Sequence, residues 1–292
     1  MINKVHSDLS SLLLSNYAKI ERQTFRMGSS ESEHDRKEWE VQHWVCLSNY
    51  YICKYQVSVF DFNLFINETS YKTNADVFKH SNTWDGDKWS LKRNVNWKHS
   101  VRNGTRVPTE YDHPVVHVSW NDAVKFCEWA SLKMNRNCRL PTEAEWECAC
   151  RANTLSPFHT GSNLSTEQAN FHGHYPYYMI GLRREGAWGD KLGKYREETV
   201  AVNSFAPNQW GLYNMHGNVY EWCVDWYRKD FYVECMGHAI VDNPLDDLTA
   251  NEKVLRGGSW WSGAKYCRSA SRFGHAPEYS DSDTGFRLVV DY

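Results

Sequence analysis

The chain has 292 residues, a net charge of −3 and a mean hydropathy of −0.69, and it contains 14 tryptophans and 17 tyrosines. This length suits one large domain or two modest ones and can bury a substantial core. The charge gives no support for nucleic-acid binding. The longest apolar run near the start, Leu12–Leu14, is too short for a membrane span or a signal peptide. We therefore expect no membrane span, and either the protein is not exported or a leader was removed before Met1.

The first third of the chain predicts a helix, two strands and a second, short helix. Residues 1–20 carry apolar side chains at helical spacing, which predicts an N-terminal helix ahead of the main body. The stretch His43–Ile66 predicts two strands that lead into a short helix. Residues 79–113 are typical of an insertion loop, because three tryptophans lie there among polar residues and glycine.

Two capping boxes predict the main helices. Ser119 and Asp122 have the spacing at which a serine accepts a backbone N–H at the start of a helix. The apolar residues after them recur on one helical face, namely Ala123, Phe126, Cys127 and Ala130. Thr142 and Glu145 repeat the device directly after Pro141. A second helix is therefore expected to begin there.

After Arg151 the pattern becomes irregular, with aromatic residues, glycine, asparagine and proline throughout, until a closing strand is predicted at Thr284–Tyr292. Long loops are unusual unless they are functional, and the many tryptophans and tyrosines suggest loops held by aromatic packing. The sequence thus predicts an α+β fold that is rich in loops, with two main helices and short antiparallel sheets.

The cysteines and histidines give no clear metal site. The nine cysteines include no CxxC pair, which argues against a thiolate zinc site. They are expected to be mostly buried free thiols, with one or two disulfides as the alternative. His172 and His174 form an H-x-H pair that could suit a metal on a strand, but their Gly/Pro/Tyr surroundings favour ordinary loop histidines.

Six motifs occur in the order found in the formylglycine-generating-enzyme (sulfatase-modifying factor) family, which the chain resembles over roughly residues 25–290. They are FRMGS, HPVVHVSWNDA, RLPTEAEWE, GLYNMHGNVYEW, VLRGGSW and TGFRLV. The resemblance implies a single domain over 1–292 with the C-type lectin fold, elaborated by extra helices and long loops. Residues 1–20 would then be an N-terminal extension.

The enzymes of that family oxidise a substrate cysteine with two copper-binding cysteines, three and eight residues after the GGS motif. Cys267 occupies the second position, but Ser262 occupies the first. A serine hydroxyl is a poor ligand for copper(I), which selects thiolates. Tyr220 also stands where the enzymes usually carry tryptophan. We therefore expect no catalytic residues and no copper, with Cys267 as a packed thiol.

Residues 254–292 resemble the variable segment of the variable proteins of diversity-generating retroelements, which share this fold. In those proteins, fixed residues alternate with positions where asparagine codons are randomised at adenines. The residues that match the fixed pattern are Gly257, Gly258, Ser259, Trp260, Ala264, Cys267, Arg268, Arg272, Pro277, Gly285, Phe286 and Arg287. The candidate ligand-binding residues lie between them: Ser262, Gly263, Tyr266, Ser271, Phe273, Gly274, His275, Tyr279, Ser280, Asp281, Ser282 and Asp283.

The composition of these candidate positions supports a binding surface, because tyrosine gives rigid contact area while serine and glycine adapt. Randomised asparagine codons can encode the amino acid at every one of these positions. They cannot encode the tryptophan, lysine and glutamate at Trp261, Lys265 and Glu278. A polar loop that binds nothing is the plain alternative. The resemblance implies a non-enzymatic binding protein at the cell surface or outside the cell. Its partner would be a macromolecule, either a protein or a surface glycan.

Two other functions remain open: a metal-dependent oxidase of the same family, and an interaction domain with one fixed partner. The resemblance also implies a calcium site, formed by the Asn214 side chain, the Gly217 and Val219 carbonyls and the Glu221 carboxylate. These are the hard oxygen ligands that calcium prefers. The alternative is that Asn214 and Glu221 only hydrogen-bond their loop.

Overall fold

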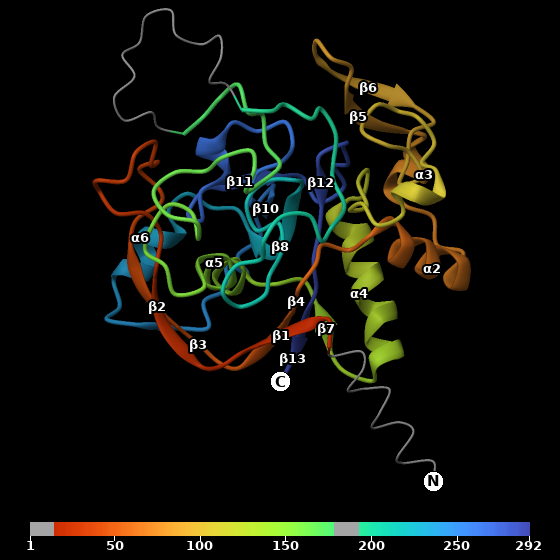
Figure 1. Ribbon diagram of the computed structural model, residues 1–292. Helices are drawn as coiled ribbons and strands as arrows, with labels where there is room; N and C mark the ends of the chain where they lie inside the picture. Colours follow the sequence, from red (N-terminus) through yellow and green to blue (C-terminus); the bar gives the residue numbers. More distant parts are fainter. Residues whose placement is uncertain (1–14, 178–192) are drawn as a thin grey trace, which may run out of the picture.

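The computed structural model describes residues 15–177 and 193–292, which form an α+β fold (Figure 1). Its helices are α2 (Val59–Thr69), α3 (Asn74–Phe78), α4 (Trp120–Met134), α5 (Glu143–Arg151) and α6 (Phe231–Met236). Two short 3-10 turns are η1 (Pro108–Glu110) and η2 (Ala264–Cys267). No helix in the described ranges is both long and apolar enough to cross a bilayer.

The strands form three small sheets and one hairpin. One sheet has the order β1 (Tyr17–Ile20), β4 (Tyr50–Cys53), β13 (Val289–Asp291) and β7 (Cys138–Arg139). A second has the order β11 (Arg272–His275), β10 (Lys253–Arg256), β8 (Tyr220–Trp226) and β12 (Thr284–Gly285). The third contains β2 (Gln23–Met27), β3 (His43–Leu47) and β9 (Val241–Asp242), and the hairpin is β5 (His80–Trp84) with β6 (Trp89–Arg93). The pairs β8–β12 and β3–β9 are parallel, whereas the other pairs are antiparallel.

Both predicted capping boxes are confirmed. The Ser119 side chain accepts a hydrogen bond from the Asp122 N–H at 3.1 Å, and the Asp122 carboxylate accepts one from the Ser119 N–H at 2.9 Å. The same exchange between Thr142 and Glu145 begins α5. The apolar face predicted for α4 is buried, and every residue of α5 is buried. Helix α5 therefore lies inside the molecule, although its sequence contains three glutamates and an arginine.

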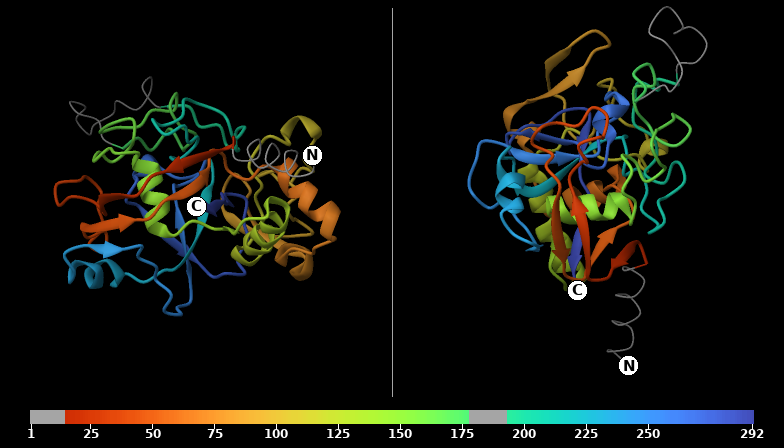
Figure 2. Two further views of the ribbon diagram at one scale, coloured as in Figure 1. Left: turned by 90° about the horizontal axis from the view of Figure 1, so that it is seen from below. Right: turned by 90° about the vertical axis from the view of Figure 1, so that its left-hand side faces the viewer.

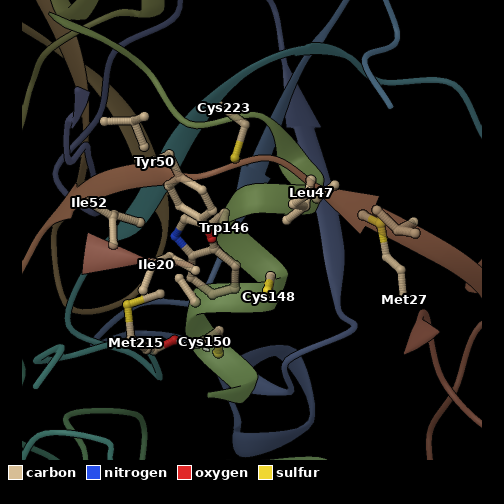
Figure 3. Close-up of a cluster of buried hydrophobic side chains, with 14 of the residues drawn as sticks. Ile20, Met27, Leu47, Tyr50, Ile52, Trp146, Cys148, Cys150, Met215 and Cys223 are labelled. Carbon is tan, nitrogen blue, oxygen red and sulfur yellow. Dashed lines mark hydrogen bonds between the residues drawn. The ribbon is translucent and has the colours of Figure 1, made fainter. Parts of the chain in front are cut away.

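Apolar packing around α5 forms one of the two large clusters of the core (Figure 3). Trp146 from α5 is fully buried beside Tyr50 and Ile52 of β4. The Tyr50 hydroxyl donates a hydrogen bond to the Glu145 carbonyl at 2.9 Å, so its polar end is satisfied. A second cluster joins α2 and α4 through stacked aromatic rings, with Phe62 and Phe126 5.9 Å apart. The two clusters hold the short strands in place.

Three sequence predictions are wrong in part. The predicted N-terminal helix is a strand at β1, while residues 1–14 lie outside the described residues. The predicted insertion loop contains the β5–β6 hairpin. The predicted closing strand is two short strands, β12 and β13, which belong to different sheets. The strands predicted within His43–Ile66 and the helix after them are confirmed by β3, β4 and α2. All nine cysteines lie in the described part of the chain as free thiols, and eight of them are buried.

The β5–β6 hairpin and the C-terminus lie at opposite ends of the molecule (Figures 1 and 2). Strand β5 is joined to residues 280–282 by backbone contacts, including the Asn82 N–H to the Ser280 carbonyl at 3.1 Å. The His117 N–H donates to the Asp281 carbonyl at 2.6 Å, and the His117 ring lies 2.9 Å from the Ser81 hydroxyl. These contacts bring the hairpin against residues 280–282 of the C-terminal segment, which comprises residues 254–292.

Candidate functional site

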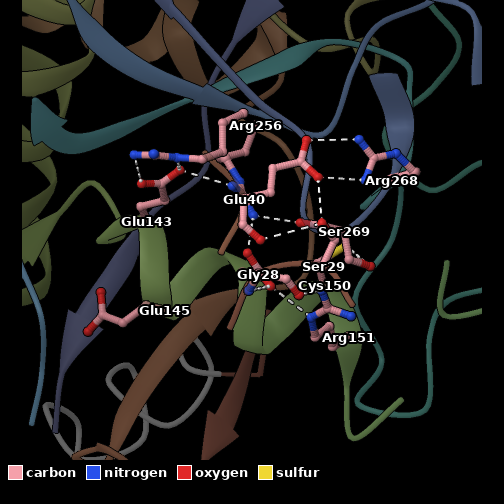
Figure 4. A network of polar contacts seen from close by, with 12 residues as sticks. Gly28, Ser29, Glu40, Glu143, Glu145, Cys150, Arg151, Arg256, Arg268 and Ser269 are labelled. Atoms are coloured by element: carbon pink, nitrogen blue, oxygen red, sulfur yellow. Dashed lines mark hydrogen bonds and ion pairs between the residues drawn. The ribbon is translucent and has the colours of Figure 1, made fainter. Parts of the chain in front are cut away.

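Four buried arginines hold the C-terminal segment to the rest of the protein. Each forms an ion pair with a buried glutamate, and they are Arg256, Arg268, Arg272 and Arg287. Figure 4 shows this polar network around Arg256 and Arg268. Such pairs need several hydrogen bonds to offset the cost of removing two charges from water. The arginines that the sequence analysis assigned to the scaffold (Arg268, Arg272 and Arg287) have this role.

Arg268 fastens the η2 turn to a loop from the N-terminal part. Its guanidinium donates to both Glu40 carboxylate oxygens at 2.8 Å, to Glu33 at 2.7 Å and to the Asp35 carbonyl at 3.0 Å. The planar guanidinium matches the carboxylate of Glu40 at two points, which fixes its orientation. The turn that contains Tyr266 is therefore fixed by the ion pair between Arg268 and Glu40.

The GGS turn packs directly against Cys267. Gly258 has φ +72°, and a Cβ placed there would lie 2.6 Å from the Cys267 sulfur. Only glycine fits, because the backbone is left-handed and the space is filled. Cys267 is fully buried, and burial with the nearby Cys150 thiol raises its pKa. The thiolate form needed for a nucleophile or a metal ligand is therefore disfavoured.

The C-terminal segment opens into a cavity of about 450 Å³, which we call the aromatic cavity. Six aromatic side chains line it: Trp89, Tyr220, Trp261, Tyr266, Phe273 and Tyr279. The Trp89 and Trp261 rings meet edge to face at 5.5 Å. The Tyr220 and Phe273 rings stack at 5.4 Å. This volume and this apolar lining are typical of a small-molecule or side-chain pocket.

Polar groups line the same cavity. They are Ser262, His275, Asp281, Asp283 and Thr284. The Ser259 hydroxyl donates to Asp283 at 2.6 Å, and the Asp283 N–H donates to the Asp281 carboxylate at 3.1 Å. Burial, followed by the negative charge of Asp281, raises the pKa of Asp283 well above its usual range. The cavity therefore combines aromatic walls with a buried acidic pair.

Seven of the twelve candidate ligand-binding residues line the aromatic cavity, and they are Ser262, Tyr266, Phe273, His275, Tyr279, Asp281 and Asp283. Tyr266 and Phe273 are 42% and 43% exposed, in agreement with the exposed face that the sequence predicts. Ser262 and Ser271, which were expected on that face, are buried instead.

The other candidates face neighbouring parts of the protein. Ser280 and Ser282 are buried. The Ser280 carbonyl accepts from the Asn82 N–H of β5, and the Ser282 carbonyl accepts from the Trp260 indole N–H. A side chain at Gly263 would meet Tyr175, and one at Gly274 would meet Tyr227, each within 3.0 Å. Tight packing at these two glycines leaves little room for variation.

Sequence reasoning missed four residues of the cavity. Trp89 comes from the hairpin, far away in the sequence, and Trp261 and Thr284 flank the proposed variable positions. Tyr220 was noted only as a departure from the tryptophan of the enzymes. The exclusion of Trp261 from the randomised set was a usable signal, because it identified this residue as part of the constant frame. No local pattern places Trp89 opposite Trp261.

The sequence and the fold are similar to those of known proteins. The sulfatase-modifying factor enzyme 1-like domain family matches residues 15–292, nearly the whole chain. The chain belongs to this family. It is 32% identical to the formylglycine-generating enzyme of Mus musculus, covering 96% of this chain and 76% of that protein. It is 33% identical to the formylglycine-generating enzyme of Thermomonospora curvata, covering 92% of this chain and 91% of that protein.

Other similar proteins carry different names. The chain is 28% identical to the inactive Cα-formylglycine-generating enzyme 2 of Bos taurus, covering 94% of this chain and 87% of that protein. The solved structure of PvdO from Pseudomonas aeruginosa is similar, with a TM-score of 0.71, 25% identity and 94% of each chain covered. Treponema denticola variable protein 1 has a TM-score of 0.67 and 23% identity, with 94% of this chain and 95% of that chain covered. The C-type lectin fold of the formylglycine-generating-enzyme type is therefore shown.

The calcium ligands implied by the family do not fit an ion as they are arranged here. Arg287 donates to both Glu221 oxygens, Gln56 donates to one at 2.9 Å and Trp146 to the other at 2.7 Å. These four donors use the whole acceptor capacity of the carboxylate, and the arginine would repel a cation. The Gln56 amide also donates to the Val219 carbonyl, at 3.4 Å. Asn214 donates to the Val202 carbonyl, and its own carbonyl oxygen has no hydrogen-bond partner among the described residues.

The histidine pair also lacks the surroundings of a metal site. His172 stacks on Tyr195 with the ring centroids 3.6 Å apart, and His174 lies edge-on to His172. Within residues 15–177 and 193–292, no cluster of three or more His, Cys, Asp or Glu side chains is placed to hold an ion. Aromatic stacking accounts for the His172 ring.

Proposed function

We propose that this protein is a non-enzymatic binding protein that takes up its ligand at the aromatic cavity and at its exposed rim, which Tyr266 and Phe273 form. The observation that carries the proposal is the position of Ser262. The family's copper enzymes use a cysteine there, whereas this chain places a serine hydroxyl 3.3 Å from the Tyr220 hydroxyl in the wall of an aromatic cavity. A site built for thiolate chemistry would need a sulfur at this position.

The surroundings of the cavity support recognition. Tyr266 and Phe273 project from a base held by buried arginine–glutamate pairs, so their positions are fixed before any ligand arrives. Preorganised aromatic side chains are typical anchors of binding interfaces. We infer that the partner is a protein or a surface glycan, met at the cell surface or outside the cell, and that variation at the exposed rim positions would change which partner is bound.

A formylglycine-generating oxidase is the second candidate, because relatives at 32% and 33% identity are enzymes of that name. It requires Cys267 to act without a thiol at position 262. The burial of Cys267 and its raised pKa weigh against this.

The exposed rim should control binding if the proposal is correct. The protein would be tested on arrays of immobilised glycans and peptides, beside Tyr266→Ala and Phe273→Ala. Each substitution is expected to weaken the bound signals by about tenfold or more, because aromatic anchors in an interface commonly contribute at least 1–2 kcal/mol. Phe60→Ala, which removes a 54% exposed aromatic ring from α2, serves as the matched control. Signals that survive both rim substitutions would place the binding site elsewhere.

A further inference from the structure

The acidic pair in the aromatic cavity, Asp281 and Asp283, differs from the buried glutamates that face the arginines of residues 254–292. Those glutamates are each paired with an arginine, and they are Glu40, Glu143, Glu147 and Glu221. Asp281 and Asp283 are 3% and 5% exposed, and no lysine or arginine is among the described residues that line their cavity. Burying carboxylates without a positive partner is costly, so either a retained proton or a bound cation must offset the charge of this pair.

The hydrogen bonds already present do not supply a positive charge. Asp283 accepts from the Ser259 hydroxyl, and Asp281 accepts from the Asp283 N–H. Both donors are neutral. The raised pKa of Asp283, caused by burial and then by Asp281, is consistent with two acids that lack a counter-charge. The Lys265 ammonium lies 5.0 Å above the Tyr266 ring, and this lysine is exposed.

The cavity wall also contains a buried hydroxyl that has no hydrogen-bond partner among the described residues. Thr284 is 1% exposed and lines the cavity, and its hydroxyl has no hydrogen-bond partner among the described residues. Buried hydroxyls are normally hydrogen-bonded, so an unpaired one beside a cavity indicates a position that a ligand or water fills.

The aromatic walls suit a positive charge. Trp261 meets Trp89 edge to face at 5.5 Å, and Phe273 stacks on Tyr220 at 5.4 Å; all four side chains line the cavity. The faces of such rings attract ammonium groups, most strongly when the site is removed from water, and aromatic cages recognise alkylated ammonium ions in this way. A neutral sugar would gain from the rings, but it would leave the acidic pair without a counter-charge.

We propose that the aromatic cavity binds an organic ammonium group, held between the tryptophan and tyrosine–phenylalanine walls and neutralised by Asp281 and Asp283. This inference rests on the proposed binding function and names the chemical class of the ligand. A lysine side chain of a partner protein and a small quaternary amine share this chemistry.

Two matched pairs of probes test the charge and separate the two sources. Choline would be compared with 3,3-dimethylbutan-1-ol, which has the same shape but no charge. Nα-acetyl-lysine methylamide would be compared with Nα-acetyl-norleucine methylamide. Isothermal titration is expected to show that at least one charged probe binds about tenfold or more tightly than its neutral partner. The tighter of the two charged probes indicates which source the cavity suits.

Two substitutions test the residues. Asp283→Asn keeps the shape of the side chain and is expected to remove most of the preference for the charged probe. Trp261→Leu, at the partly exposed wall, is expected to weaken the charged probe about tenfold and its neutral partner less. Glu278→Gln, an exposed acid outside the cavity, and Trp44→Leu, a 46% exposed tryptophan on β3, are the matched controls and should change neither affinity. Thermal unfolding of each variant checks that it is folded.

The outcomes separate this inference from the proposed function. Equal binding of charged and neutral probes, or no binding of any probe, overturns the ammonium site. The proposed function would still stand if array signals depend on Tyr266 and Phe273. If those signals also ignore the rim, then the proposed function fails as well.

Discussion

Replacing Glu147 with alanine is expected to lower the free energy of unfolding by about 3–5 kcal/mol, because it breaks a buried ion-pair network. Burial opposes the charge of Glu147, yet Arg151 and Arg256 hold its pKa below the usual range. Its carboxylate accepts from Arg151 and from the Gly28 N–H at 2.8 Å, and from Arg256 at 2.6 Å. Without it, two buried guanidinium groups lose their shared anion.

Urea denaturation at neutral pH measures this effect. Glu147→Gln keeps the volume of the side chain but removes its charge. It is expected to lower the free energy of unfolding nearly as much as Glu147→Ala does, because the two arginines need the negative charge. Glu128→Ala is the matched control. It removes a glutamate that is 57% exposed beside Lys125, and it should cost less than about 1 kcal/mol. Equal losses in Glu147→Ala and Glu128→Ala would show that the buried network does not stabilise the fold.

Arg268→Ala is expected to have an effect of similar size, about 3–5 kcal/mol, because it leaves two glutamates buried without a cation. Glu33 and Glu40 are 4% and 0% exposed at their side chains. Burial already raises the pKa of Glu33 despite its hydrogen bond with Arg268, so the loss of the arginine leaves this carboxyl still less favourably placed. The η2 turn, which contains Tyr266, would also lose its contact with the N-terminal part of the protein.

Arg268→Lys distinguishes charge from geometry. A lysine keeps the charge but lacks the planar fork that contacts Glu40 at two points, so it should recover only part of the stability. Arg102→Ala is the control, since that arginine is 64% exposed beside Glu197. The unfolding free energies of all three variants decide the question, and full recovery by lysine would contradict the geometric role.

Local patterns predicted the parts of the fold that depend on local contacts. The Ser119 and Thr142 boxes each satisfy backbone donors within one helical turn, so their spacing is enough to locate α4 and α5. Strands need distant partners. The four residues of β1 pair with β4, at least thirty positions later, and the apolar residues that precede them suggested a helix.

The candidate site was predictable in its frame and less so in its surface. The resemblance to the variable segment identified Gly258, Cys267 and Arg268. The structure explains two of them, because only glycine fits the turn at Gly258 and Arg268 pairs with a buried carboxylate. The exposure of each loop residue depends on what crosses it. Contacts with β5 bury the segment 280–282, and no spacing within the C-terminal segment reveals this.

We propose that this member of the sulfatase-modifying factor enzyme 1-like family binds a ligand and does not oxidise cysteine. The most direct test incubates the copper-loaded protein with a cysteine-containing peptide in air and labels any aldehyde with a hydrazide. The formylglycine-generating enzyme of Thermomonospora curvata is the positive control. We predict no aldehyde above the background that Cys267→Ala gives. An aldehyde that forms with the unaltered protein and does not form with Cys267→Ala would contradict the proposal that this protein does not oxidise cysteine.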